Sequence, residues 1–154
     1  MATLFTGLSA GLCFTWANVV TPGIARLNDM AYLQAFRQMN KAILNPPFIV
    51  VFFGAIFLII ATTILHWALP SYMVWMLIGA LVLYFVGVVL VTIFGNVPLN
   101  EMLDKTDLSE LSLDGAKSLR DRFEDSWNKL HLVRTVTAII SFSLLLLTCV
   151  TKAV

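Results

Sequence analysis

The chain has 154 residues, of which 59% are hydrophobic and 12% are charged, and its mean hydropathy is +0.88. Soluble domains carry about 25% charged residues, so this composition excludes a soluble globular protein and predicts an integral membrane protein. The formal net charge of +1 gives no indication of nucleic-acid binding, and no nucleic-acid partner is expected.

Three long segments contain no Asp, Glu, Lys or Arg: residues 1–25, 42–100 and 135–151. A hydrocarbon core of about 30 Å requires about 20 such residues per helix. The sequence therefore predicts an all-α polytopic membrane protein, in which a single domain over residues 1–154 forms a four-helix transmembrane bundle. The expected spans are residues 2–20, 47–67, 71–94 and 130–150.

The first span has no basic residues ahead of its apolar core, so we expect a retained transmembrane helix and not a cleaved secretory signal. Four spans place both termini on the same side of the membrane. The opposite side receives nine of the ten Lys and Arg residues, and only Lys152 lies with the termini. Because basic residues favour the cytoplasm, we expect a multi-pass protein of the inner cell membrane whose termini are both non-cytoplasmic.

Two glycines of the first span, Gly7 and Gly11, are four residues apart and form a small-residue face that allows close helix packing. Gly79 and Gly87 offer a similar smooth face on the third span. These faces suit packing within the bundle. They equally suit contact with a second copy of the chain or with a partner in a membrane complex. Membrane lipid is expected around the bundle.

Both polar connections are expected to be cytoplasmic and helical. Residues 24–44 place apolar side chains at helical spacing, which predicts an amphipathic helix at the membrane surface. Asn45 is expected to cap the next helix, with Pro46 at its first position. Residues 101–129 are more charged, and from about Gly115 they can continue as a helix into the fourth span.

The third span ends in the sequence FGNVPLN at residues 94–100. Pro98 has no amide hydrogen, so the carbonyl of Phe94 loses its helical donor and the helix is expected to break or kink. A break at this depth is tolerated where polar side chains repair it or where it lines a cavity, and Asn96 and Asn100 suit either role. Helix termination with asparagine caps is the alternative.

The fourth span opens with three side chains of unusual chemistry for a membrane helix. Trp127, His131 and Arg134 are spaced i, i+4 and i+7, so they form one stripe along the helix. An arginine and an imidazole are costly in lipid, so the stripe is expected to face the bundle interior or a water-filled cavity. Interfacial anchoring, an ordinary role of Trp and Arg, is the alternative.

The predicted topology brings polar residues from all four spans to the cytoplasmic edge, where they form a candidate site. His66 and His131 lie near opposite membrane faces, so they cannot jointly bind a haem. The sequence has no zinc-ligand spacing and no phosphate-binding loop, and no metal site is expected. The predicted cluster consists of Asn18, Asn40, Asn96, Asn100, Trp127, Asn128, His131 and Arg134.

Four motifs carry a family resemblance: GLxxG at residues 7–11, MNKAILNP at 39–46, NVPLN at 96–100 and WNxxHxxR at 127–134. In this combination, which covers nearly the whole chain, the sequence resembles the anthrone oxygenase-like family of small four-span membrane proteins. The resemblance implies oxidation of anthrones to anthraquinones with no flavin or haem cofactor. Most relatives in this family have no assigned substrate.

This resemblance leads to a hypothesis for the site. An anthrone has an acidic methylene, and histidine exchanges protons near neutral pH, so His131 is the candidate base. Arg134, Asn100 and Asn96 are candidate stabilisers of the developing oxygen charge. Trp127 would stack on a planar aromatic substrate. The further candidate substrate contacts are Asn128, Asn18 and Asn40.

Two other classes of function compete with the enzyme. The protein can be a non-catalytic scaffold or accessory subunit, in which the polar cluster only ties helix ends together. It can also bind a lipid or a quinone in the same place. A cavity lined by Asn96, Asn100, Trp127 and His131 would favour an enzyme or a binder, and a filled, fully hydrogen-bonded cluster would favour the scaffold.

Overall fold

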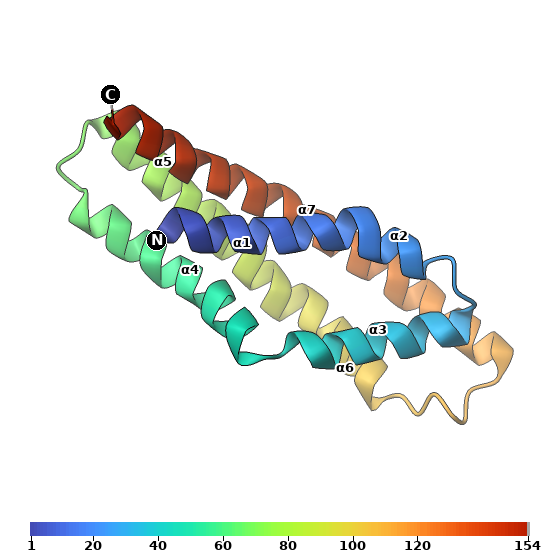
Figure 1. Cartoon of the computed structure of the whole chain (residues 1–154). Helices are drawn as coiled ribbons and strands as arrows, with labels where there is room; N and C mark the ends of the chain where they lie inside the picture. Colours follow the sequence, from blue (N-terminus) through green and yellow to red (C-terminus); the bar gives the residue numbers. More distant parts are fainter. Residues whose placement is uncertain (154) are drawn as a thin grey trace.

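The computed structural model describes residues 1–153, and all regular elements of this part of the chain are helices (Figure 1). Four of the described helices are long and apolar enough to cross a membrane. The predicted all-α membrane bundle is confirmed, and the chain is a multi-pass membrane protein. These helices cover Ala2–Ile24, Pro46–Leu65, Ser71–Lys105 and Leu113–Lys152.

The first and third spans each join several helical elements. The first consists of α1 (Ala2–Thr15), the π-helical segment η1 (Trp16–Val20) and α2 (Thr21–Ile24). The third consists of α5 (Ser71–Val82), the π-helical segments η2 (Leu83–Leu90) and η3 (Thr92–Asn96), and α6 (Val97–Lys105). The remaining elements are α3 (Asp29–Ile43), α4 (Pro46–Leu65) and α7 (Leu113–Ala153).

The two ends of the bundle differ in what they carry. Both termini and the turn between α4 and α5 lie toward one end, and α3 and the loop between α6 and α7 lie at the other (Figure 1). These relative positions agree with an even number of spans. That the α3 end faces the cytoplasm stays a prediction.

Local signals in the sequence fix several helix starts. The side chain of Asn45 accepts a hydrogen bond from the amide of Phe48 at 3.0 Å, and Pro46 is the first residue of α4, as predicted. Such a cap satisfies an amide that has no partner within the helix. α7 begins at Leu113, so the predicted continuation of the second connection into the fourth span is confirmed.

The third span is distorted near Pro98, but it does not break there. The helix widens into the π-helical turns η2 and η3, and Pro98 is the second residue of α6. At the end of η3 the amide of Val97 bonds to the carbonyl of Thr92, five residues earlier. The first span has the same order, since η1 directly precedes α2 with Pro22 in its first turn. Wider turns accommodate the missing proline donor without interrupting the helix.

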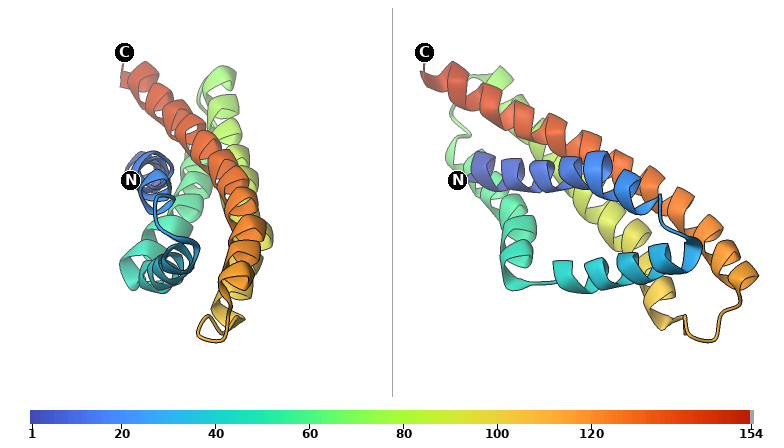
Figure 2. Two further views of the ribbon diagram at one scale, coloured as in Figure 1. Left: turned by 90° about the vertical axis from the view of Figure 1, so that its right-hand side faces the viewer. Right: turned by 45° about the vertical axis from the view of Figure 1, so that its right-hand side comes forward.

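α3 packs against protein on its apolar face. Tyr32, Leu33 and Phe36 are each 0% exposed and lie in one cluster with Leu103 of α6 and Phe123 of α7. Figure 2 shows α3 running beside the first part of α7. The predicted amphipathic helix is therefore present, and its buried face covers the ends of the third and fourth spans.

A second cluster fills the middle of the bundle, and one tyrosine links three spans within it. The Tyr84 hydroxyl is hydrogen bonded to the Ser9 hydroxyl and donates to the carbonyl of Phe52, both at 3.0 Å. Tyr84 itself is 0% exposed. Because its hydroxyl has partners, the ring can be buried without leaving an unpaired polar group.

α7 contacts the first span, the third span and α3 along one continuous face. Its buried residues recur every three or four positions, the spacing of a single helix face. Gly87 of η2 lies close against this helix, and a Cβ added there would lie 2.5 Å from atoms of Thr137. Gly7 faces Phe142 of α7, whereas the described residues leave the space at Gly11 open. A partner on the Gly7 and Gly11 face stays a prediction.

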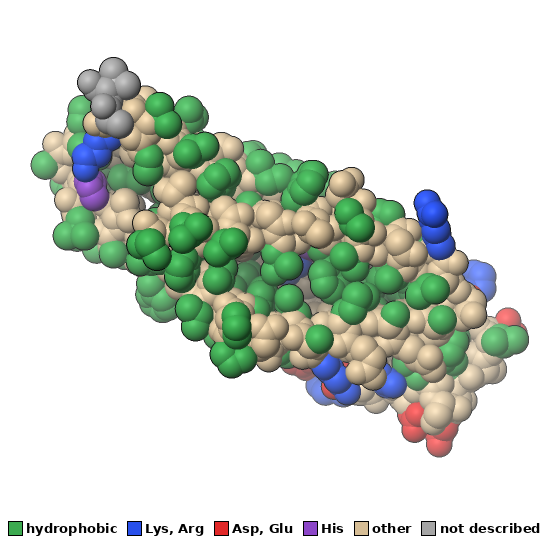
Figure 3. All heavy atoms as spheres, in the orientation of Figure 1, with side chains coloured by type: hydrophobic (Ala, Val, Ile, Leu, Met, Phe, Trp, Pro, Cys, Tyr) green, Lys and Arg blue, Asp and Glu red, His purple; other side chains and the backbone are tan. Residues whose placement is uncertain are grey.

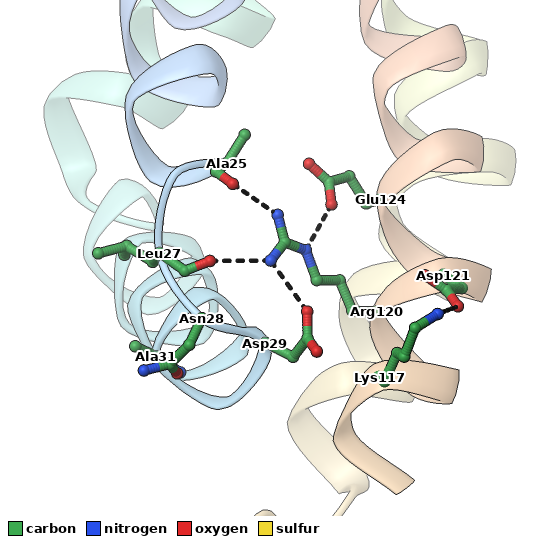
Figure 4. Close-up of polar contacts among 9 residues, drawn as sticks. All are labelled: Ala25, Leu27, Asn28, Asp29, Ala31, Lys117, Arg120, Asp121 and Glu124. Atoms are coloured by element: carbon green, nitrogen blue, oxygen red, sulfur yellow. Dashed lines mark hydrogen bonds and ion pairs between the residues drawn. The ribbon is translucent and has the colours of Figure 1, made fainter. Parts of the chain in front are cut away.

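Arg120 fastens α7 to the segment that leads into α3 (Figure 4). Its guanidinium donates to the carbonyls of Ala25 and Leu27 at 2.8 and 2.9 Å, and to the carboxylates of Asp29 and Glu124 at 3.0 and 2.6 Å. The guanidinium also lies 4.3 Å above the ring of Tyr32. Burial raises the pKa of the Tyr32 phenol, which keeps this ring neutral. The three charge-assisted bonds to Ala25, Leu27 and Asp29 hold two distant segments together, and the bond to Glu124 orients the guanidinium from within α7.

Replacing Arg120 by Lys should loosen α3. Lysine keeps the charge but cannot form a planar fork of four bonds, so the free energy of unfolding should fall by about 2 kcal/mol. Amide exchange within α3 should become faster than in the unaltered protein, whereas exchange within α4 should not change. The matched control is Arg122→Lys, since Arg122 is exposed on the same turn of helix. Unchanged exchange in α3 of the Arg120 variant would contradict this role.

Gly87→Ala tests the close approach of η2 and α7. The new methyl group would overlap the side chain of Thr137, and overpacking of this kind costs about 1–3 kcal/mol. The thermal midpoint of unfolding in lipid nanodiscs should drop accordingly. Gly11→Ala adds the same methyl group in open space and should leave the midpoint unchanged. Equal midpoints for the two variants would refute the packing.

Candidate functional site

A cavity of about 100 Å³ lies in the half of the bundle that adjoins α3. Side chains from α1, α3, α4, the end of the third span and α7 surround it. Its apolar walls are Leu12, Ile43, Leu44, Phe48, Phe52 and Val97. Its polar and aromatic lining consists of Ser9, Cys13, Trp16, Asn40, Thr92, Asn100, Trp127, His131 and Arg134.

The cavity opens through the side of the bundle. Leu12, Leu44 and Val97, which line it, are all exposed. In the space-filling view this face is hollowed among hydrophobic side chains, and a basic side chain lies at the bottom of the hollow (Figure 3). The rim is thus apolar and the floor is polar, an arrangement that suits a largely apolar ligand with a polar end.

His131 occupies the centre of the polar floor and is 3% exposed. Its Nε2 lies 3.0 Å from the carbonyl oxygen of Cys13 in α1, and its Nδ1 lies 2.6 Å from a guanidinium nitrogen of Arg134. A carbonyl can only accept and a guanidinium can only donate. His131 therefore carries its proton on Nε2, and the lone pair of Nδ1 accepts from Arg134.

Among the described residues, Arg134 is the only charged one that lines the cavity. Besides His131, its guanidinium donates to the hydroxyl of Thr92 at 3.0 Å and lies 5.6 Å from the ring centre of Trp127. No carboxylate in residues 1–153 forms an ion pair with it. A buried cation without a counter-ion is costly in a membrane, so the site attracts negative charge.

Trp127 holds the polar floor in position. It is 3% exposed, and its ring is stacked on the imidazole of His131, with ring centres 4.8 Å apart. Its indole nitrogen donates to the side chain of Asn100 at 2.8 Å, and its carbonyl accepts from the side chain of Asn96 at 3.2 Å. One face of Trp127 is thus occupied by His131, and the ring orients the imidazole.

Three buried donors around the cavity have no hydrogen-bond partner within the described residues. They are the indole nitrogen of Trp16, the amide nitrogen of Asn40 and the Nε of Arg134. Each unpaired buried donor costs about 1–3 kcal/mol. All three lack an acceptor, so the cavity is suited to a ligand that carries oxygen atoms.

The structure brings together most of the predicted cluster. Asn40, Asn100, Trp127, His131 and Arg134 line the cavity. Asn96 is 1% exposed and lies behind the lining, bonded to the backbone of Trp127.

Two predicted residues do not join this group. Asn18 is exposed on the outside of η1, and Asn128 is partly buried on α7 without lining the cavity.

The polar contributors Trp16, Thr92 and the carbonyl of Cys13 were not predicted, and neither were Ser9 and the apolar walls of the cavity. Thr92, Asn96 and Asn100 recur every four residues, so the helical spacing that linked the two asparagines also pointed to Thr92. A backbone carbonyl has no sequence signal. Trp16 stands six residues before Pro22, and only the fold shows that it faces the cavity.

Metal ligands do not gather here. Residues 1–153 contain no group of three or more His, Cys, Asp and Glu side chains that could hold a metal ion. The lining offers one imidazole, one thiol and neutral amides, with a cation among them. This donor set recognises anions and carbonyl oxygens better than it recognises a cation.

Fold and site together define a multi-pass membrane protein with a polar-floored cavity inside a helical bundle. A protein-family model described as anthrone oxygenase matches residues 32–144. The match covers more than two thirds of the chain and includes the cavity residues of α3, α6 and α7, so the chain belongs to the anthrone oxygenase family. No curated protein and no solved structure matches the chain.

The hydrogen-bond pattern of His131 can be measured directly. In a His66→Gln variant, ¹⁵N-labelled histidine reports on His131 alone, because the chain has two histidines. Nuclear magnetic resonance at neutral pH should find the proton on Nε2 and none on Nδ1. In a further Arg134→Gln variant the signal of Nδ1 should shift, because its donor changes. A proton on Nδ1 in the first variant would contradict the contact with Arg134.

Proposed function

We propose that the protein oxidises a planar phenolic, anthrone-like substrate with dioxygen in the cavity beside His131 and Arg134. The observation that carries this proposal is the uncompensated charge of Arg134 against the imidazole of His131. Membership of the anthrone oxygenase family supports the choice of substrate class. A cation next to a proton acceptor is the pair that the formation of an enolate requires.

Arg134 stabilises the oxygen of the substrate. Removing a proton from the methylene of an anthrone moves negative charge onto the ketone oxygen across the ring. A guanidinium in a partly dry site stabilises such charge more strongly than it would in water. Asn100 and Asn96 act behind it, because they fix Trp127 and through it the imidazole.

His131 is the base, and its use is coupled to binding. In the free protein its Nδ1 lone pair accepts from Arg134, so it is not available to the substrate. When the guanidinium turns one N–H toward a substrate oxygen, Nδ1 is released. The Nε2–H of His131 donates to the carbonyl of Cys13, and this hydrogen bond keeps the proton on Nε2.

The reaction balances with dioxygen as the oxidant. Nδ1 accepts the methylene proton, and the electron pair of the C–H bond passes into the enolate. The enolate transfers electrons to dioxygen, a C–O bond forms at the former methylene carbon, and the peroxide takes the proton back from His131. Loss of water leaves a carbonyl. One anthrone and one dioxygen thus give one anthraquinone and one water.

The scaffold and the lipid or quinone binder use the same residues differently. A scaffold needs a filled and fully bonded cluster, and the cavity with its unpaired donors counts against it. A binder would share the cavity without the chemistry. The apolar rim supports access from the bilayer, and we place the cavity toward the cytoplasmic side of the inner membrane because the basic residues gather there.

The test is turnover of 1,8-dihydroxyanthrone by protein in nanodiscs, followed as dioxygen uptake and anthraquinone formation above the rate without protein. His131→Gln keeps a side-chain N–H for the carbonyl of Cys13 but removes the base, so the rate should fall by about 100-fold or more. His131→Ala should be equally inactive. His66→Gln, at the other end of the bundle, should keep full activity.

Folding of each variant is checked by its thermal midpoint in the same nanodiscs. A folded His131→Gln protein with the unaltered rate would exclude His131 as the base. An unaltered protein without turnover would overturn the proposed function.

A further inference from the structure

We infer that Trp16 is a specificity-determining residue, whose indole N–H donates to an oxygen of the bound ligand. This inference rests on the proposed function and deepens it, because it concerns how the same cavity selects its substrate. It assigns a role to a residue outside the part of the chain that matches the family.

The unpaired polar atoms of the molecule are distributed unevenly. Several buried side-chain atoms of the described residues have no partner, and both donors and acceptors occur among them. Those on residues that line the cavity are donors in every case: Trp16 Nε1, Asn40 Nδ2 and Arg134 Nε. The buried acceptors without partners, on Asn96 and Asn128, lie on residues that do not line it.

The indole of Trp16 is held in place before any ligand arrives. Its ring centre lies 6.1 Å from that of Phe36 in α3 and 6.1 Å from that of Trp127 in α7. Aromatic contacts on two sides fix the ring plane, and with it the direction of the N–H. A donor that is already oriented loses little freedom on binding, so its hydrogen bond contributes fully to selectivity.

The three donors come from three different elements of the fold. Trp16 starts η1, Asn40 lies near the end of α3, and Arg134 lies on α7. A ligand with acceptor oxygens would join these elements across the cavity. A planar hydrocarbon of the same shape would leave all three donors unpaired, and sites built to bond an oxygen reject analogues that lack it.

Two probes separate hydrogen bonding from packing. One is 1,8-dihydroxyanthraquinone, which has the oxygens and cannot be oxidised further at its carbonyls. The other is anthracene, which has the three rings and no oxygen. Their dissociation constants are measured with full-length protein in nanodiscs, for Trp16→Phe and for the control Trp75→Phe, whose parent side chain is 70% exposed at the other end of the bundle.

Trp16→Phe should weaken the dihydroxyanthraquinone about tenfold and leave anthracene unchanged, since it removes the N–H and keeps an aromatic ring. Asn40→Leu, which removes a second donor at similar volume, should show the same selectivity. Trp75→Phe should change neither constant.

Equal weakening of both probes by Trp16→Phe would reduce Trp16 to a packing residue and overturn the inference. So would unchanged binding of the dihydroxyanthraquinone by both the Trp16 and the Asn40 variants. In either case the proposed function would stand, because the unaltered protein still binds the oxygenated probe. If the unaltered protein bound neither probe, the inference and the proposed function would both fall.

Discussion

Arg134 carries a positive charge into the bundle, where each of its described contacts is a neutral group. An imidazole nitrogen, a threonine hydroxyl and the ring of Trp127 surround the guanidinium. These groups disperse the charge but do not cancel it, so the cavity keeps a positive potential in a medium of low dielectric constant. The proposed preference for a ligand with acceptor oxygens rests on this remaining positive charge.

α7 is the element that makes this arrangement possible. A single helix of 41 residues is about 60 Å long, roughly twice the hydrocarbon thickness, so it serves both the membrane and the region beyond it. On the same face, Arg120 binds the segment before α3 at one level and Arg134 faces the cavity four turns further on. Because Arg120 keeps α3 against α7, the far end of α3 delivers Asn40 to the cavity wall. The two arginines differ in their hydrogen bonding. Every guanidinium nitrogen of Arg120 is bonded, whereas the Nε of Arg134 has no partner among the described residues.

Features of the fold and the site that depend on a single helix could be predicted from the sequence, and features that depend on contacts between helices could not. Charge-free segments predicted the spans, and helical spacing predicted that Trp127, His131 and Arg134 share one face, because both are properties of a single helix. The cap at Asn45 was predictable for the same reason. Tertiary packing decided the rest. Asn18 and Trp16 are two residues apart, yet the first is exposed and the second lines the cavity. Both lie in the π-helical segment η1, and no sequence pattern indicated this segment. The acceptor for His131 is a backbone carbonyl, which any residue at position 13 would supply.

In the proposed mechanism, the guanidinium of Arg134 gives up its hydrogen bond to His131 and bonds a substrate oxygen instead, and the chemistry depends on this step. The most direct measurement is an experimental structure of the protein with 1,8-dihydroxyanthraquinone bound. We expect the three rings between the apolar walls, a ligand oxygen on the guanidinium of Arg134, and the Nδ1 of His131 released from its donor. A ligand bound elsewhere, or one bound in the cavity with the contact between Arg134 and His131 intact and no oxygen on the guanidinium, would contradict this mechanism.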